Sequence, residues 1–352
     1  MIVLSEPDPF DEIAKKFATL SPDKFKQRMN EMLESHPNEE SKKFWDEYGS
    51  LREKPGRHDE KIKLLNSILE INSGDFLAWF EKGRLLGESG NHQGALTCFE
   101  KVTELKPEHV LGWANRGYAL DLLGKNEESL QYFDKAIEKD QNNFLAWEYK
   151  GMALGNLAKY EEAIECFDKA IELDPDNILS WFKKGFAYFR IAKPTMGDED
   201  RKNYEKALEC FEKATSLLNT MEVGVSVITY VVEQKPYLAK TKILYHKGLT
   251  FLILKQPKEA LECFEEILHV DPNSSGKNPK IWYAKSQALQ ELEMEQKSNK
   301  CFEYALELGF QPGKDFLYKE NPDDLTVEEV REFQPNEEKV EDAEFKKDQQ
   351  KQ

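Results

Sequence analysis

Apolar residues recur along most of the chain at helical spacing, in columns that repeat every 34 residues. The clearest column holds tryptophan, at Trp79, Trp113, Trp147 and Trp181. Glycine follows each of these after four residues, and phenylalanine follows the first three after twenty. Because apolar positions at helical spacing occur twice in each period, every repeat predicts two amphipathic helices joined by a turn.

The same columns continue in both directions. The segment 157–170 recurs as 191–193 plus 204–214, so ten residues, 194–203, are inserted at the expected helix–helix turn. Two further repeats follow a second insertion, 215–243, which contains the β-branched run VGVSVITYVVEQ. No such repeat can bury its apolar face alone, so the units must stack into a solenoid.

This periodicity predicts the organisation of the whole chain. A weaker repeat with Trp45 and Gly49, but with Leu65 in the phenylalanine column, precedes the regular ones. The predicted units are an N-terminal helical cap (1–41), a degenerate repeat (42–75), six repeats (76–308), a C-terminal cap (309–320) and an acidic, largely disordered tail (321–352).

All five cysteines fall in one column of this pattern, immediately before the phenylalanine: Cys98, Cys166, Cys210, Cys263 and Cys301. Equivalent helices of successive repeats lie about 8–10 Å apart or more. A disulfide or a zinc site requires a much closer approach. We therefore interpret the cysteines as small apolar filler.

The net charge and the absence of catalytic or metal-ligand motifs limit the classes of function that this chain could have. The formal net charge is −17, with 66 acidic and 49 basic residues, so nucleic acids and anionic membranes are unfavourable partners. The N-terminus MIVLSEPDPFDE reaches acidic and proline residues too early for a signal peptide, which favours a cytoplasmic protein. The six histidines form no metal-ligand motif. We expect no catalytic activity, no cofactor and no metal.

The repeat resembles the tetratricopeptide repeat (TPR), which has a 34-residue period with Trp, Leu, Gly, Tyr, Ala, Phe, Ala and Pro positions. The resemblance covers about 45–308. It implies an all-α fold, a right-handed superhelical solenoid of stacked helix–turn–helix repeats with helical caps. In this family the first helix of each repeat lines a concave groove that holds a peptide or a helix of a partner.

The resemblance also implies which residues line that groove. They are Phe80, Arg84, Asn115, Tyr118, Tyr149, Met152, Phe182, Lys183, Phe186, Phe189, Arg190, Lys242, Tyr245, His246 and Leu249. The set is rich in aromatic residues, and its charges are positive. If they are exposed, such residues are typical of protein-binding hot spots. One subset of the family binds chaperone tails through a clamp of two Lys, two Asn and one Arg, and here only Asn115 matches it.

These features predict a non-catalytic adaptor or scaffold that binds a peptide or helix carrying apolar and acidic residues. Three alternatives stay open at this point. The array could be the substrate-recruiting arm of an enzyme or transferase complex, or its groove could be occupied by its own acidic tail. RNA binding by helical repeats is the third, against which the net charge argues.

Overall fold

The protein is described by a computed structural model at residues 39–52, 54, 56–193, 197–220, 236–270 and 275–311. The predicted N-terminal cap up to residue 38 and the acidic tail lie outside these residues. So do residues 221–235 of the second insertion.

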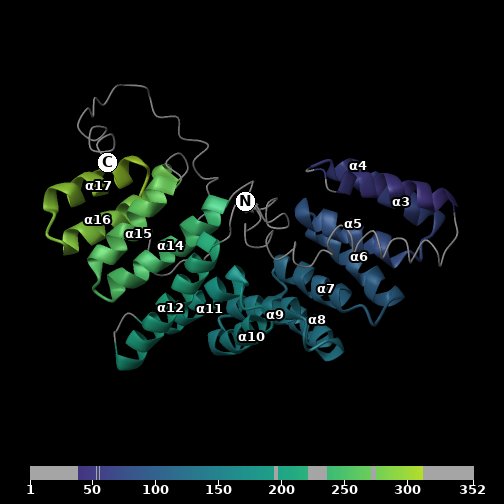
Figure 1. Cartoon of the computed structure of the whole chain (residues 1–352), viewed down its shortest axis with the longest axis horizontal. Coiled ribbons are helices and arrows are strands. Elements are labelled where there is room, and N and C mark those ends of the chain that lie inside the picture. Colours follow the sequence, from purple (N-terminus) through teal and green to yellow (C-terminus); the bar gives the residue numbers. More distant parts are fainter. Residues whose placement is uncertain are drawn as a thin grey trace, which may run out of the picture.

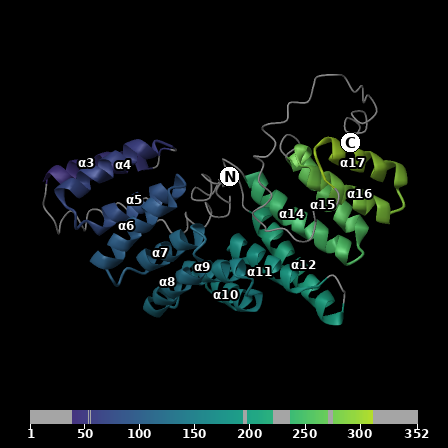
Figure 2. The ribbon, with the colours of Figure 1, turned by 180° about the vertical axis from the view of Figure 1, so that it is seen from behind.

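The described chain is a row of helices. They are α3 (Glu39–Arg52), α4 (His58–Ile71), α5 (Phe76–Glu88), α6 (His92–Leu105), α7 (Val110–Leu122), α8 (Asn126–Lys139), α9 (Phe144–Asn156), α10 (Tyr160–Leu173), α11 (Ile178–Ile191), α12 (Asp198–Thr220), α14 (Pro236–Ile253), α15 (Pro257–Val270), the 3₁₀ turn η1 (Ser275–Lys277), α16 (Pro279–Glu291) and α17 (Glu295–Glu307). The pairs follow one another along an arc, from α3–α4 at one end to α16–α17 at the other (Figure 1). The view from behind shows the same order (Figure 2).

Five of the first helices begin at a side chain that accepts a hydrogen bond from a backbone amide of the first turn: α5, α7, α9, α11 and α16. Asp75 accepts from the amides of Leu77 and Ala78, and Asn177 accepts from the amide of Ser180. A cap of this kind is worth about 1 kcal/mol. The Asp/Asn/Pro clusters that punctuate the sequence therefore determine where the first helices start.

The tryptophan column anchors each first helix to the turn before it. The indole nitrogens of five tryptophans donate to the backbone oxygen six residues earlier: Trp79 to Ser73, Trp113 to Pro107, Trp147 to Gln141, Trp181 to Pro175 and Trp282 to Gly276, at 2.7–2.9 Å. Trp45 of the weaker repeat instead donates to a carboxylate oxygen of Asp75 at 3.1 Å. The glycine column serves close packing inside each pair. A Cβ on Gly151 would lie 2.7 Å from the ring of Phe167, so a larger residue there would collide with the second helix.

Successive repeats are linked by ion pairs at equivalent positions. An acidic residue directly after the phenylalanine of one repeat meets a basic residue on the first helix of the next repeat. The pairs are Glu100–Arg116, Asp134–Lys150, Asp168–Lys184, Glu212–Lys247 and Glu265–Lys285, with N–O distances of 2.5–3.6 Å. Each exposed pair contributes little stability alone. Their recurrence at five junctions shows that these repeats stack on one another in an equivalent way.

The two insertions change the helices around them. The residues 198–203 of the first insertion belong to α12, whose first turn carries Asp198, Glu199 and Asp200, charges that suit a helix N-terminus. The same helix continues to Thr220 and is 23 residues long, whereas α10 has 14. The first insertion was expected to fall in the turn, and part of it instead lengthens the second helix of its repeat.

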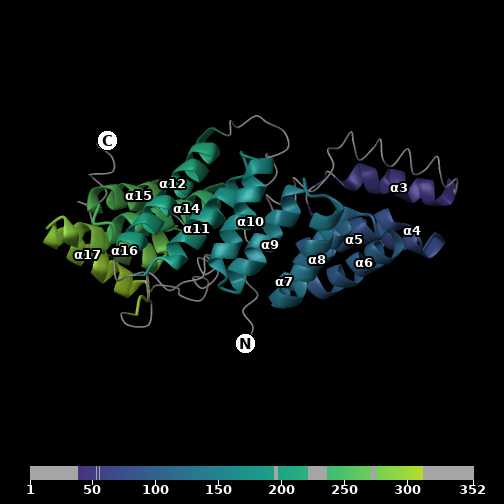
Figure 3. The ribbon, with the colours of Figure 1, turned by 90° about the horizontal axis from the view of Figure 1, so that it is seen from below.

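The arc has a distinct inner layer. Among the described residues, the first helices of neighbouring repeats contact one another directly: α7 with α9, α9 with α11, α11 with α14, and α14 with α16. The inner layer of an arc is the shorter one, which brings these helices together on the concave side (Figure 1). From below, the pairs are seen side by side along the array (Figure 3).

Candidate functional site

The fifteen residues expected to face a partner all lie on first helices. Phe80 and Arg84 belong to α5, and the other thirteen lie on α7, α9, α11 and α14. The expectation that the aromatic ones are exposed is wrong. Every aromatic member of the set is at most 8% exposed, and Met152, Lys242, His246 and Leu249 are buried too. Aromatic rings of adjacent helices pack against one another, which removes them from the surface.

Two of these aromatic residues meet at the contact between α7 and α9. The rings of Tyr118 and Tyr149 are stacked with their centroids 4.5 Å apart, and Phe133 lies 6.1 Å from Tyr149. Asn115 on the same face is half-buried and donates from its side-chain amide to the backbone oxygen of Leu111 at 2.8 Å. This part of the set forms core between two repeats.

A larger cluster forms where α11 contacts α14. The imidazole of His246 is surrounded by the rings of Phe182, Phe186, Phe189, Phe211 and Tyr245, with centroid distances of 5.2–6.3 Å. His246 is 3% exposed. Residues more than fifty positions apart in the sequence thus converge at one point of the inner layer.

The electrostatics of His246 are unusual. Burial, together with the nearby cations Lys242, Lys183 and Arg190, lowers the pKa of the imidazole from 6.5 to about 3, so the ring is neutral near pH 7. Neither ring nitrogen has a hydrogen-bond partner in the structure. A neutral imidazole has one donor and one acceptor nitrogen. His246 is therefore a buried polar group with two unused hydrogen-bonding positions.

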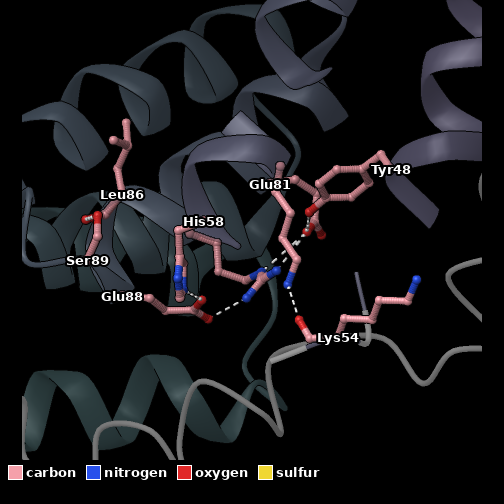
Figure 4. Close-up of polar contacts among 9 residues, drawn as sticks. Tyr48, Lys54, His58, Glu81, Leu86, Glu88 and Ser89 are labelled. Atoms are coloured by element: carbon pink, nitrogen blue, oxygen red, sulfur yellow. Dashed lines mark hydrogen bonds and ion pairs between the residues drawn. The ribbon is translucent and has the colours of Figure 1, made fainter. Parts of the chain in front are cut away.

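Arg84 on α5 lies in a different setting, among Glu81, Glu88 and their own partners Tyr48 and His58, which Figure 4 labels. Its guanidinium donates to one carboxylate oxygen of Glu81 at 3.1 and 3.3 Å and also pairs with Glu88. Tyr48 donates to the same oxygen of Glu81 at 2.6 Å, and His58 lies 3.4 Å from Glu88. Burial alone would lower the pKa of Arg84, but Glu88 and Glu81 raise it well above its ordinary value.

Several members of these clusters were not expected from the sequence. Tyr48, Glu81 and Glu88 complete the network around Arg84, and Phe211 closes the cluster around His246. Phe211 was recognisable only as a member of the phenylalanine column. A comparison of equivalent positions in different repeats would have shown that Glu81 corresponds to Lys183, and this change of charge is the signal that marks the two regions as different.

The five cysteines lie on second helices, and all are buried. Burial raises the pKa of the Cys98 thiol to about 11 and that of Cys210 to about 12. Thiols of this kind are mostly protonated and weakly nucleophilic near neutral pH. Their burial agrees with the interpretation as apolar filler.

Stacked helix pairs with a repeated contact between a glycine of the first helix and a phenylalanine of the second define a helical-repeat solenoid. Models of the tetratricopeptide repeat match the sequence at residues 80–144, 132–165 and 241–274, and a model described as TPR repeat matches residues 158–191. The chain therefore contains tetratricopeptide repeats at these residues, as its sequence pattern predicted.

Solved structures agree on the fold. The type IV pilus biogenesis factor PilW superimposes with a TM-score of 0.55 at 15% identity, covering 67% of this chain and 96% of PilW. The pilF protein of Pseudomonas aeruginosa superimposes with a TM-score of 0.51 at 16% identity, covering 67% of this chain and 92% of that protein. A tetratricopeptide repeat protein of Parabacteroides merdae superimposes with a TM-score of 0.51 at 12% identity, covering 78% of this chain and 95% of that protein. At these identities the likeness concerns the fold alone.

Two further findings bear on function. No curated protein matches the chain. Within the described residues, every helix is too short or too polar to cross a bilayer.

Proposed function

We propose that this protein is a non-catalytic cytoplasmic adaptor that holds a segment of another protein against the concave side of its repeat array. One observation supports this most directly: aromatic, histidine and cationic side chains of α11 and α14 converge at one point of the inner layer. The partner segment carries apolar and acidic residues, which suit such surroundings. Nucleic acids and membranes are not its ligands, since the chain has a net charge of −17.

The affinity of such a contact can be estimated from its parts. Each apolar side chain that a partner buries contributes about 1.5–3 kcal/mol. Three or four of them offset the cost of association and reach micromolar affinity, about −8 kcal/mol. The half-buried Lys183 and Arg190 reach the surface in part, so a partner meets them first.

The test compares three forms of the full chain as baits in a lysate of the source organism. The site variant is Lys183→Glu/Arg190→Glu. The control variant is Lys101→Glu/Lys169→Glu, which reverses two exposed lysines on the second helices α6 and α10. Circular dichroism first establishes that all three are equally helical.

We expect wild type and the control to capture a protein that the site variant does not capture. The captured protein is then purified, and its affinity for each form is measured by calorimetry. A loss of at least about tenfold for the site variant alone supports the proposal. Equal affinities for all three forms would refute it.

A further inference from the structure

We propose that residues 313–320, the docking segment, bind to α17 as the start of one more first helix, with Lys319 beside Glu303. The periodicity predicts a C-terminal cap at 309–320, but it names neither the surface that the cap covers nor the contact that sets its register. The last described repeat supplies both. The inference is independent of the proposed function.

The first observation is an acidic residue at the end of the row of ion pairs between repeats. The column of acidic residues that follow the phenylalanines continues to Glu303 on α17. In the five earlier second helices this acid pairs with a base on the first helix of the next repeat, as in Asp134–Lys150. Glu303 is exposed and forms no ion pair with any residue in the described part of the chain. A first helix that carries a base is therefore what this position lacks.

The second observation is that two apolar side chains of α17 are uncovered. Phe302 is half-buried, whereas the five earlier members of its column are at most 4% exposed. Leu306 is 42% exposed. At the equivalent position of α6, Thr103 is 3% exposed and accepts a hydrogen bond from Arg116 of the next repeat. Among the residues that the structure describes, the face of α17 that corresponds to a junction between repeats is thus open.

The spacing of the sequence indicates which segment fits this face. In three successive junctions the acid and the base are 16 residues apart: Glu100–Arg116, Asp134–Lys150 and Asp168–Lys184. Lys319 lies 16 residues after Glu303. In the same register Phe316 lies 34 residues after Trp282, in the tryptophan column. The docking segment therefore carries an aromatic residue and a base at the two positions that a first helix uses at this junction.

The chain is also held at this face where its described part ends. The pair α16–α17 lies at one end of the arc (Figure 1). Phe310 is 4% exposed, and its ring stacks on that of Tyr283 of α16 with the centroids 4.1 Å apart. The docking segment begins two residues after Gln311. A short tether gives an effective concentration of about millimolar, which favours this segment over a second copy or a separate partner.

The two kinds of contact have different roles in this arrangement. The exposed pair between Lys319 and Glu303 contributes little stability by itself, so it sets the register. Phe316 and Leu317 cover the open apolar side chains of α17, and their burial holds the segment in place. A solenoid end that stays open has the apolar character of a junction between repeats, which favours association with other chains. The docking segment closes that surface.

The experiment measures disulfide formation between introduced cysteines in the full chain under a mild oxidant. The test variant is Glu303→Cys/Lys319→Cys. The first control, Lys297→Cys/Lys319→Cys, moves one cysteine about 120° around α17. The second control, Glu303→Cys/Lys314→Cys, shifts the register. Wild type is the blank, because its five cysteines are buried. Circular dichroism first establishes that all variants are equally helical, and peptide mass spectrometry identifies each disulfide.

The apolar contacts are tested in the same test variant. Phe316→Asp/Leu317→Asp is added to it in one protein, and Phe333→Asp, further along the chain, is added in another as the control. If burial of Phe316 and Leu317 holds the segment on α17, only the first addition slows disulfide formation.

We expect the test variant to form an intramolecular disulfide at least about tenfold faster than either control variant. The change of Phe316 and Leu317 to aspartate should slow it at least about tenfold, and Phe333→Asp should leave it unchanged. Equal rates in the three cysteine pairs, a faster control or a rate that does not depend on Phe316 and Leu317 would overturn the inference. Disulfides formed mainly between two chains would also overturn it, because the occupant of α17 would then be a second copy.

Discussion

The α5 region and the α11 region place different chemistry at the same positions of the repeat. Glu81, Arg84 and Glu88 on α5 are three repeats of 34 residues before Lys183, Phe186 and Arg190 on α11. On α5 the two acids neutralise the arginine, and Tyr48 and His58 complete the network (Figure 4). On α11 the acids become bases, and the arginine becomes a buried aromatic ring beside His246.

This difference shows how equivalent positions of a repeat array can differ in chemistry from one repeat to another. Tryptophan, glycine and phenylalanine columns set the backbone of both regions in the same way, so three positions on the inner side are free to vary. Filled with complementary charges, they form a local network that satisfies itself. On α11 two of these positions hold the basic residues Lys183 and Arg190, and the third holds Phe186 beside the imidazole of His246. Four predictions test the contrast, from the largest effect to the smallest.

The phenylalanine column supports both regions equally. Phe99 and Phe211 are both buried, at 4% and 0% exposure, each against the glycine of its own repeat. We expect Phe99→Ala and Phe211→Ala each to reduce the free energy of unfolding by about 3–5 kcal/mol, measured by urea titration. The exposed Leu105→Ala is the control and should change it by less than about 0.5 kcal/mol. If only one of the two phenylalanine variants is destabilised, the repeats do not share one packing plan.

Charged residues at equivalent positions of α5 and α11 should have unequal effects on the free energy of unfolding. Glu81→Gln removes a buried carboxylate that pairs with the half-buried Arg84, and we expect a loss of about 2–3 kcal/mol in the free energy of unfolding. Lys183→Gln changes a half-buried position of α11, and its effect on the free energy of unfolding should stay within about 0.5 kcal/mol. Both are measured by thermal and urea unfolding. Equal losses in the two variants would contradict the contrast between the regions.

The α11 region should also make stability depend on pH. Folding lowers the pKa of His246 from its ordinary value of 6.5 to about 3. Between these two pH values the unfolded chain therefore binds one proton that the folded chain does not bind. The contribution of the neutral His246 to the free energy of unfolding is therefore fully present above about pH 6.5, and it is lost as the pH falls toward about 3. Between about pH 7.5 and about pH 5, wild type should lose about 2 kcal/mol more than His246→Leu. Parallel curves for the two proteins would show that His246 is not held neutral.

The smallest effect concerns the cysteines. Burial raises the pKa of Cys210 to about 12 and that of Cys98 to about 11, so at pH 8 Cys210 has about a tenfold smaller thiolate fraction. Iodoacetamide should therefore modify Cys98 first in the folded chain, as followed by peptide mass spectrometry. In urea both should react at one rate. Faster reaction of Cys210 in the folded state would contradict the burial around α12.

The helix pairs were predictable because their signals are local. Trp113 and Phe133 lie in one repeat, and their spacing specifies the two helices and the contact between them. The burial of Phe182 and Phe186 could not be read in the same way. Both pack against His246, which follows two insertions further along the chain, and no periodic spacing connects them. The network around Arg84 likewise depends on Tyr48, from the weakest repeat.

The sequence by itself determined the repeat length, the helix pairs, the family and the column in which each cysteine lies, because all of these depend on residues within one period. Only the tertiary structure decided which of the expected partner-facing side chains are buried, and where their charges converge. Burial and electrostatic potential depend on side chains of neighbouring repeats that meet when the helices stack. The repeat pattern therefore specifies the array, and stacking determines where the aromatic and cationic cluster of α11 and α14 forms.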